Sequence, residues 1–155
     1  MRVSDEGLAL IKHHEGYSAT PYLCPAQVWT IGYGHAMRPA DVPKYRAGIT
    51  REQGEALLRM DVRIAERAVM RLITSPLNQS QFEALVSFTF NLGAHRLQTS
   101  TLRQVINRGE YERAPAQFKR WVWGGGRKLQ GLIRRRADEA ELFMRELDDN
   151  FASEY

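Results

Sequence analysis

The longest regular pattern in the sequence is a helix that begins after Thr50, and its length limits how the chain can fold. Thr50 and Gln53 have the spacing of a capping box, in which each side chain bonds to a backbone N–H group of the other residue. Apolar residues then recur at roughly helical spacing as far as about Ile73. A helix of about 24 residues spans about 35 Å at a rise of about 1.5 Å per residue. We therefore expect this helix to join two lobes.

Length and composition indicate one globular domain. The 155 residues are 43% hydrophobic and 26% charged, which allows a buried core without disulfides. Cys24 is the only cysteine, so it has no partner for an internal disulfide. No apolar run predicts a signal peptide or a membrane span. We expect a single domain over residues 1–155, with lobes at about 12–50 and 74–155 and the linking helix at about 50–73.

Helix caps and apolar spacing predict five further helices. They are expected at about residues 5–15, 78–92, 101–108, 113–122 and 132–147. The second is apolar nearly all round and should be the buried centre, whereas Gly124–Gly126 is expected to be a flexible break. The inward side of the last helix is expected to be Ala140, Phe143, Met144 and Leu147. Ion pairs at i, i+4 spacing are expected on its outside. They are Arg134–Asp138, Arg135–Glu139 and Glu141–Arg145.

Residues 16–37 contain no Lys, Arg, Asp or Glu, although the chain is 26% charged. Glu15 borders this stretch and follows Leu8 and Ile11 at helical spacing, so it lies in line with the apolar stripe of its helix. Uncharged surroundings disfavour a charged carboxylate. Such a carboxyl group is suited to donate a proton.

A strand is predicted within the uncharged stretch, over Val28–Tyr33. Alternation places two sets of side chains on opposite faces. They are Trp29, Ile31 and Tyr33 on one face, and Thr30, Gly32 and Gly34 on the other. The glycines either allow close approach to the backbone or form a tight hairpin bend, and both interpretations stay open.

The stretch HHEGYSATPYLCPAQVWTIGYGH, residues 13–35, resembles the catalytic stretch of phage-type lysozymes, the endolysins of glycoside hydrolase family 24. The family pattern has Glu, eight residues, Asp or Cys, five residues, Thr, and then Ile-Gly-x-Gly-His. Glu15, Cys24 and Thr30 meet both spacings. The likeness extends over nearly the whole chain, through FTFNLG at 88–93, STL at 100–102 and GLIRRRADEAELF at 131–143.

This resemblance implies an α+β, lysozyme-like fold, with a small N-terminal lobe of short strands joined by the long helix to a helical C-terminal lobe. It implies a muramidase that hydrolyses the β-1,4 bond between N-acetylmuramic acid and N-acetylglucosamine in bacterial peptidoglycan, generally with inversion. No metal or cofactor is expected. The enzyme is expected to act as a monomer and to wait in the host cytoplasm until a holin opens the way to the cell wall.

Glycosidic cleavage requires an acid on the leaving oxygen and a second group that places water or stabilises positive charge. Glu15 is the expected acid, and Thr30 could orient the water. Cys24 occupies the position where other family members have Asp, either as a thiolate base or as a neutral hydrogen-bonding group. In a rival interpretation, Cys24 is the nucleophile of a peptidoglycan amidase or peptidase, with His35, His13 or His95 as its base. A binding module without turnover is a third possibility, which Glu15 argues against.

Other residues are assigned supporting roles by the resemblance. His35 is expected to pair with Asp61 on the linking helix. Asn91 and Thr101 match residues that line the sugar cleft. Either Arg134 or Arg135 on the final helix is expected to approach Glu15.

Residues 113–136 carry eight basic residues and no acidic residue, within a chain of net charge +4. Such a stretch favours a polyanionic partner. Charge alone points first to nucleic acid, but no zinc-finger, RRM or P-loop spacing supports it. An anionic cell wall or outer membrane surface and a merely solvated face both stay open. We expect no nucleic-acid binding and no stable membrane insertion.

Overall fold

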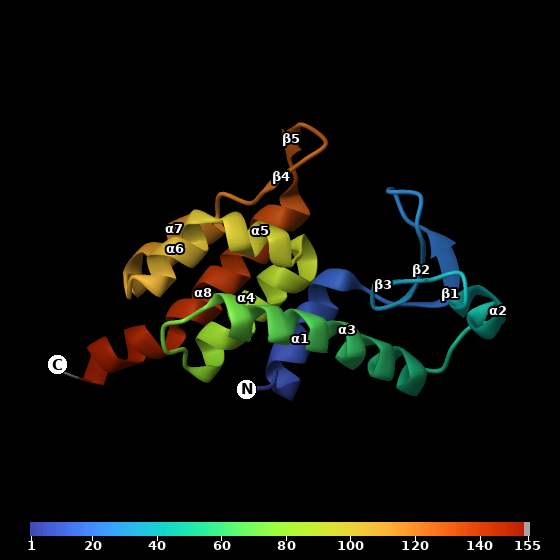
Figure 1. Ribbon diagram of the computed structural model, residues 1–155, viewed down its shortest axis with the longest axis horizontal. Coiled ribbons are helices and arrows are strands. Elements are labelled where there is room, and N and C mark those ends of the chain that lie inside the picture. The colour runs from blue at the N-terminus through green and yellow to red at the C-terminus, as the bar shows by residue number, and fades with distance from the viewer. Residues whose placement is uncertain (154–155) are drawn as a thin grey trace.

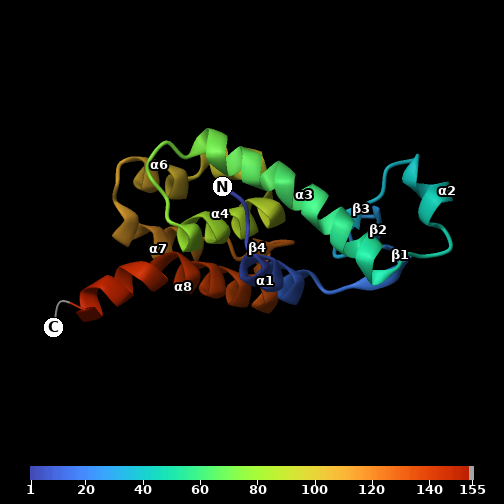
Figure 2. The ribbon, with the colours of Figure 1, turned by 90° about the horizontal axis from the view of Figure 1, so that it is seen from below.

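The computed structural model describes residues 1–153, with the side chains of residues 1–146. A small lobe of short strands and a larger helical lobe are joined by helix α3, Arg51–Leu72 (Figures 1 and 2). The predicted capping box is present, because Thr50 accepts from the Gln53 N–H group and Gln53 accepts from the Thr50 N–H group. The expected linking helix is therefore confirmed, and it ends at Leu72, with Ile73 as its C-cap.

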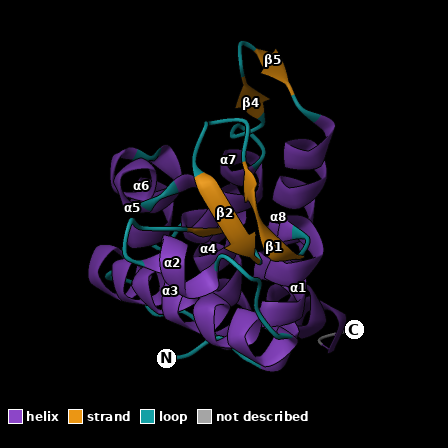
Figure 3. Ribbon diagram, turned by 90° about the vertical axis from the view of Figure 1, so that its right-hand side faces the viewer, coloured by secondary structure: helices purple, strands orange, loops and turns teal. Residues whose placement is uncertain are grey.

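The small lobe contains a three-stranded antiparallel sheet (Figure 3). Its order is β1 (Ser18–Leu23), β2 (Trp29–Gly32) and β3 (His35–Ala36). A short helix, α2 (Asp41–Tyr45), follows in the connector to α3 and was not expected. Together they enclose a minor core of Ile31, Tyr45 and Leu57.

The predicted strand faces are only partly confirmed. Ile31 and Tyr33 are buried, but Trp29 on the same predicted face is 51% exposed. Strand β2 ends at Gly32, and Tyr33 belongs to the main core rather than to the core under the sheet. Positive φ at Gly32 and Gly34 breaks the alternation, because the chain turns there.

Helix α1 (Asp5–Glu15) and the predicted central helix, α4 (Gln79–Leu92), agree with the sequence analysis. Ser4 caps α1 by accepting from the Gly7 N–H group, and Gly16 follows its last residue at φ 68°. Helix α4 lies against α1, α3 and the long C-terminal helix, α8 (Gln130–Ser153). Its buried side chains include Phe82, Leu85 and Phe88, as expected of the core of the larger lobe.

The remaining elements cover one side of α4 and α8. They are α5 (Ala94–Thr99), α6 (Thr101–Asn107), the 3₁₀ turn η1 (Tyr111–Arg113) and α7 (Ala114–Phe118). Helix α5 was not expected, and the predicted helix over 113–122 is shorter because α7 ends at Phe118. None of the described helices is long and apolar enough to cross a bilayer.

The expected flexible break at Gly124–Gly126 is wrong. These residues form a β-hairpin of β4 (Trp123–Gly124) and β5 (Arg127–Lys128), which projects from the helical lobe (Figure 3). The two turn residues, Gly125 and Gly126, have φ values of 59° and 80°. Two-residue hairpins with a type I′ turn require positive φ at both central positions, which glycine adopts without strain.

Of the three ion pairs expected on the outside of α8, Arg135–Glu139 is present but buried, and the other two are replaced by contacts with α1. Arg145 pairs with Glu6 of α1, and Asp138 pairs with His14. Arg135 does contact Glu139, but both side chains are buried. Ala140 and Phe143 face the core as expected and Met144 is partly buried, while Leu147 lies beyond the described side chains.

Candidate active site

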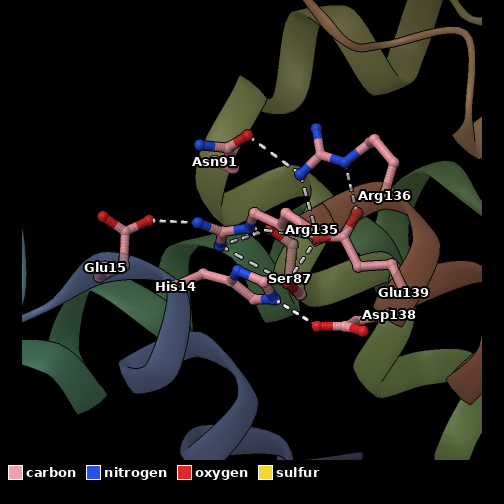
Figure 4. Close-up of polar contacts among 8 residues, drawn as sticks. All are labelled: His14, Glu15, Ser87, Asn91, Arg135, Arg136, Asp138 and Glu139. Carbon is pink, nitrogen blue, oxygen red and sulfur yellow. Dashed lines mark hydrogen bonds and ion pairs between the residues drawn. The ribbon is translucent and has the colours of Figure 1, made fainter. Parts of the chain in front are cut away.

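Glu15 is the last residue of α1, and its carboxylate meets a guanidinium from the other end of the chain. Oε1 of Glu15 accepts from Nη1 of Arg135 at 2.6 Å, and the Glu15 side chain is 20% exposed (Figure 4). Leu8 and Ile11 are buried beneath it, as the apolar stripe predicts. The expectation of uncharged surroundings is therefore wrong, whereas the expected approach of Arg134 or Arg135 is confirmed, and the residue is Arg135.

Arg135 belongs to a buried polar group that joins α8 to α4. Its Nε donates to Oε2 of Glu139 at 3.3 Å, and its Nη2 donates to the backbone oxygen of Ser87 at 3.2 Å. Arg136 donates from Nη2 to the same Glu139 oxygen at 3.0 Å. Ser87 donates from its hydroxyl to that oxygen at 2.6 Å. The sequence analysis did not place Ser87, Arg136 or Glu139 at the site.

Burial acts on both charged partners within this group. It raises the pKa of the Glu139 carboxyl, and the guanidiniums of Arg136 and Arg135 oppose that rise. Burial also lowers the pKa of the Arg136 guanidinium, and the neighbouring carboxylate of Glu139 opposes that fall. Buried charges need such partners, since an unpaired one is strongly disfavoured. The two guanidiniums share the one carboxylate of Glu139, and Arg135 also contacts Oε1 of Glu15.

Gly34 faces the second oxygen of Glu15. A Cβ atom at position 34 would lie 2.8 Å from Oε2 of Glu15, and the residue has φ +79°. Gly34 therefore provides both the turn and the close approach, the two interpretations that the sequence left open. Oε1 is held by Arg135, so Oε2 is the oxygen that faces the turn.

Cys24 and Thr30 lie together at the tip of the β1–β2 hairpin. Cys24 N–H donates to Val28 O at 3.0 Å, and Gln27 N–H donates back to Cys24 O at 2.8 Å. Hydrogen bonds to the thiol, from the backbone of Val28 first and also from Ala26 and Thr30, lower the pKa of Cys24, with partial burial opposing them. The hydroxyl of Thr30 donates to Val28 O at 3.0 Å, and Thr30 is buried.

The expected contact between His35 and Asp61 is present. Nδ1 of His35 lies 2.8 Å from Oδ2 of Asp61, which ties β3 to α3. On its other side, Nε2 of His35 lies 3.6 Å from a carboxylate oxygen of Asp41, a partner that the sequence analysis missed. The backbone N–H of Arg38 is the main cause that lowers the pKa of Asp41. This arrangement is structural, since it holds the turn that carries Gly34.

A hollow of about 910 Å³ lies beside Arg135, between the end of α1 and the start of α8. Asn91 lines it and accepts from Nη2 of Arg136 at 3.0 Å, which is consistent with its expected place at a cleft. Thr101, the first residue of α6, is not among the lining residues.

Known proteins identify the family. The sequence profile of the family described as phage lysozyme matches residues 12–139. The chain belongs to the phage lysozyme family. It is 41% identical over 149 residues to an endolysin of Acyrthosiphon pisum secondary endosymbiont phage 1, covering 92% of this chain and 98% of the relative. It is 39% identical to the endolysin of Bacillus phage B103 over 93% of this chain, and it spans about half of that relative, 54%.

Solved structures agree with this membership. The muramidase domain of SpmX from Asticaccaulis excentricus is similar with a TM-score of 0.82 and 37% identity, over 92% of this chain and 97% of that domain. The expected lysozyme-like α+β fold is therefore confirmed. This phage lysozyme is a glycoside hydrolase of the muramidase endolysin class, and nothing in these comparisons supports the amidase or peptidase alternative.

One cluster of metal-ligating groups occurs among the described residues of this phage lysozyme. His13, His14 and Asp138 bring three ligand atoms within 4.8 Å of one another. Nε2 of His14 and Oδ2 of Asp138 are already paired at 2.8 Å. Burial is the main cause that lowers the pKa of His14, and Arg135 adds to it. The sequence analysis expected Asp138 to pair with Arg134 on its own helix, so its contact with His14 of α1 was missed.

Proposed function

We propose that Glu15 is the general acid with which this phage lysozyme hydrolyses the β-1,4 bond between N-acetylmuramic acid and N-acetylglucosamine. The observation that carries this proposal is the placement of its carboxylate, with Oε1 on Arg135 and Oε2 toward the glycine turn. In this proposal Oε2, the oxygen that Arg135 does not hold, protonates the leaving-group oxygen. After proton transfer, the guanidinium of Arg135 stabilises the carboxylate that remains, which favours the transfer.

Cys24 and Thr30 are proposed to act on the opposite face of the sugar. A lowered thiol pKa increases the thiolate fraction of Cys24 at neutral pH. A thiolate can accept a proton from the attacking water or stabilise positive charge on the sugar, the tasks of the second carboxylate in other glycosidases. The hydroxyl of Thr30 would help to place that water.

The amidase or peptidase alternative needs a base on the thiol. Among the described residues, no hydrogen bond joins a histidine to Cys24. His35 is engaged between Asp61 and Asp41 instead. A cysteine nucleophile is normally activated by an adjacent base. The geometry therefore favours the muramidase.

Product analysis tests the reaction. Peptidoglycan digested with the purified protein should release muropeptides that end in reducing N-acetylmuramic acid, as measured by mass spectrometry. Products with a 1,6-anhydro end would show that the reaction is that of a transglycosylase rather than hydrolysis. Release of stem peptides would contradict the proposal.

Glu15→Gln tests the residue. The variant should fold normally and lose about 10²–10⁴-fold in rate, since it lacks the acid. Glu141→Gln is the matched control, because Glu141 is an exposed carboxylate on α8. Rates should be measured as turbidity loss of isolated cell walls. If folded Glu15→Gln clears walls at the rate of the control, Glu15 is not the acid.

We also propose that the protein stays in the host cytoplasm until a holin releases it, and that it acts as a monomer. The polymer it cleaves lies outside the cytoplasmic membrane, so an enzyme made inside needs a route across. All groups of the proposed site come from one chain, which requires no second copy. Expression should lyse cells only when a membrane lesion is added, and light scattering should give the monomer mass. Lysis without a lesion would exclude holin dependence.

A further inference from the structure

Glu139 is a fully buried carboxylate that contacts two arginines at once. Its Oε2 accepts from Nε of Arg135 at 3.3 Å, from Nη2 of Arg136 at 3.0 Å and from the hydroxyl of Ser87 at 2.6 Å. Its Oε1 lies 2.7 Å from Nε of Arg136. Glu139 is 0% exposed, so no substrate or solvent reaches it directly. Its influence on the reaction has to pass through the two arginines (Figure 4).

The first arginine leads to the acid. A guanidinium is planar and presents its donors in a fixed fork. In Arg135, Nε is bound by Glu139 and Nη2 by the backbone oxygen of Ser87. With these two edges fixed, Nη1 points to Oε1 of Glu15 at 2.6 Å.

The second arginine leads to Asn91. Nη2 of Arg136 donates to Oδ1 of Asn91 at 3.0 Å. A guanidinium can only donate, so the amide oxygen of Asn91 has to face Arg136 and its NH₂ group has to face away. Figure 4 shows the amide nitrogen of Asn91 directed away from Arg136. Since Asn91 lines the 910 Å³ hollow, its NH₂ group is available to a hydroxyl or carbonyl oxygen of the substrate.

We propose that Glu139 is a positioning residue that orients the acid and a substrate donor together. It holds Arg135 against Glu15, and it holds Arg136 against Asn91. Without its carboxylate, two buried guanidiniums would repel each other, and each would lose the contact that fixes its plane. This inference rests on the proposed role of Glu15 as the acid.

Steady-state kinetics on a soluble, uncrosslinked peptidoglycan fragment separate the two branches. Arg135→Lys should lower kcat, because it acts through the acid. Arg136→Lys should raise KM with little change in kcat, because it acts through Asn91. Glu139→Gln should do both, with kcat lower by roughly tenfold to a hundredfold, the effect expected of misplacing reacting groups by up to about 1 Å.

The Asn91 branch has its own test. Asn91→Ala should raise KM, and Arg136→Lys should add nothing to the KM of an Asn91→Ala protein. A KM that rises further in the double variant would show that Arg136 does not act through Asn91. A Glu139→Gln protein that folds and keeps wild-type kcat and KM would overturn the proposal.

Glu139→Gln could destabilise the fold, so Ser87→Ala provides a milder change. It removes one of the three donors to Oε2 and leaves both arginines paired. It should lower kcat by a few fold, whereas Ser80→Ala, a buried serine on the same helix that contacts Arg145 and Glu146, should not. Equal kinetics for the two serine variants would also overturn the proposal. If Glu15→Gln is itself active, the proposed role of Glu15 as the acid is wrong. That measurement is separate from the Glu139→Gln and serine variants, which test the role of Glu139.

Discussion

Gly34→Ala separates the two tasks of this glycine, because the chain has a matched control. Gly34 and Gly126 have φ values of +79° and +80°. A Cβ atom at 34 would meet Oε2 of Glu15, whereas a Cβ atom at 126 would have nothing within 4 Å. Alanine therefore introduces the same backbone strain at both positions and a new contact at only one.

The backbone strain should lower the free energy of unfolding by the same amount in the two variants. A non-glycine residue in the left-handed region costs roughly 1–2 kcal/mol. For a chain of this length, each kcal/mol lowers Tm by about 2–4 °C, so both variants should melt about 2–8 °C below wild type. Thermal unfolding followed by circular dichroism measures this shift.

The new contact with Oε2 of Glu15 should lower the activity of Gly34→Ala only. Oε2 has to retreat by about 0.6 Å, from 2.8 Å to the 3.4 Å at which ordinary contacts begin. Because a misplacement of about 1 Å can cost roughly 10²-fold in rate, we expect a loss of about tenfold at a temperature where both variants are folded. Gly126→Ala should clear cell walls at the wild-type rate. Equal activities of the two variants would refute the argument that Gly34 makes room for the acid.

Three further predictions follow from the other groups. Cys24→Asp should keep activity, since Asp provides the same charge, and Cys24→Ala should lose most of it; a folded but inactive Cys24→Asp would count against the proposed role. Because burial lowers the pKa of His14, the unfolded chain, where His has a pKa of about 6.5, binds the proton first. The contribution of His14 to stability is thus present above about pH 6.5 and lost as pH falls. Urea unfolding should therefore show that the free energy of unfolding falls less between pH 7 and pH 5 for His14→Gln than for wild type, and an equal fall would contradict this. Steering by the basic stretch should weaken as salt rises, since the screening length is about 8 Å at physiological strength. Lysis by a quadruple Gln variant should then depend less on salt than lysis by wild type, and parallel curves would exclude steering; the four exposed positions are Lys119, Arg120, Arg127 and Lys128.

The basic stretch at 113–136 shows that a count of charges along the sequence overstates the charge exposed at the surface. Eight basic residues were counted between 113 and 136. Arg135 and Arg136 are buried and paired, so they cannot contribute to an exposed patch. Charge density along a sequence counts residues without regard to burial, and the helix face that turns inward depends on what packs against it.

Local structure and the catalytic motif could both be predicted from the order of the residues. The caps at Ser4, Thr50 and Asn78 act over three residues, so their helices could be predicted from spacing alone. The spacing of Glu15, Cys24 and Thr30 likewise identified the family without coordinates. These features depend on neighbours along the chain, whose interactions are set by backbone geometry.

The family resemblance limited the basic neighbour of the acid to Arg134 or Arg135, and the packing of the helices selects Arg135 and buries its partners. Helical spacing allowed an Arg135–Glu139 pair but placed it in solvent, whereas packing of α8 on α4 buries it beside Ser87. The same packing brings Arg135 to Glu15, across 120 residues of sequence. Contacts between distant segments depend on which faces of two helices meet, and that choice is made by the burial of the whole core rather than by any local pattern.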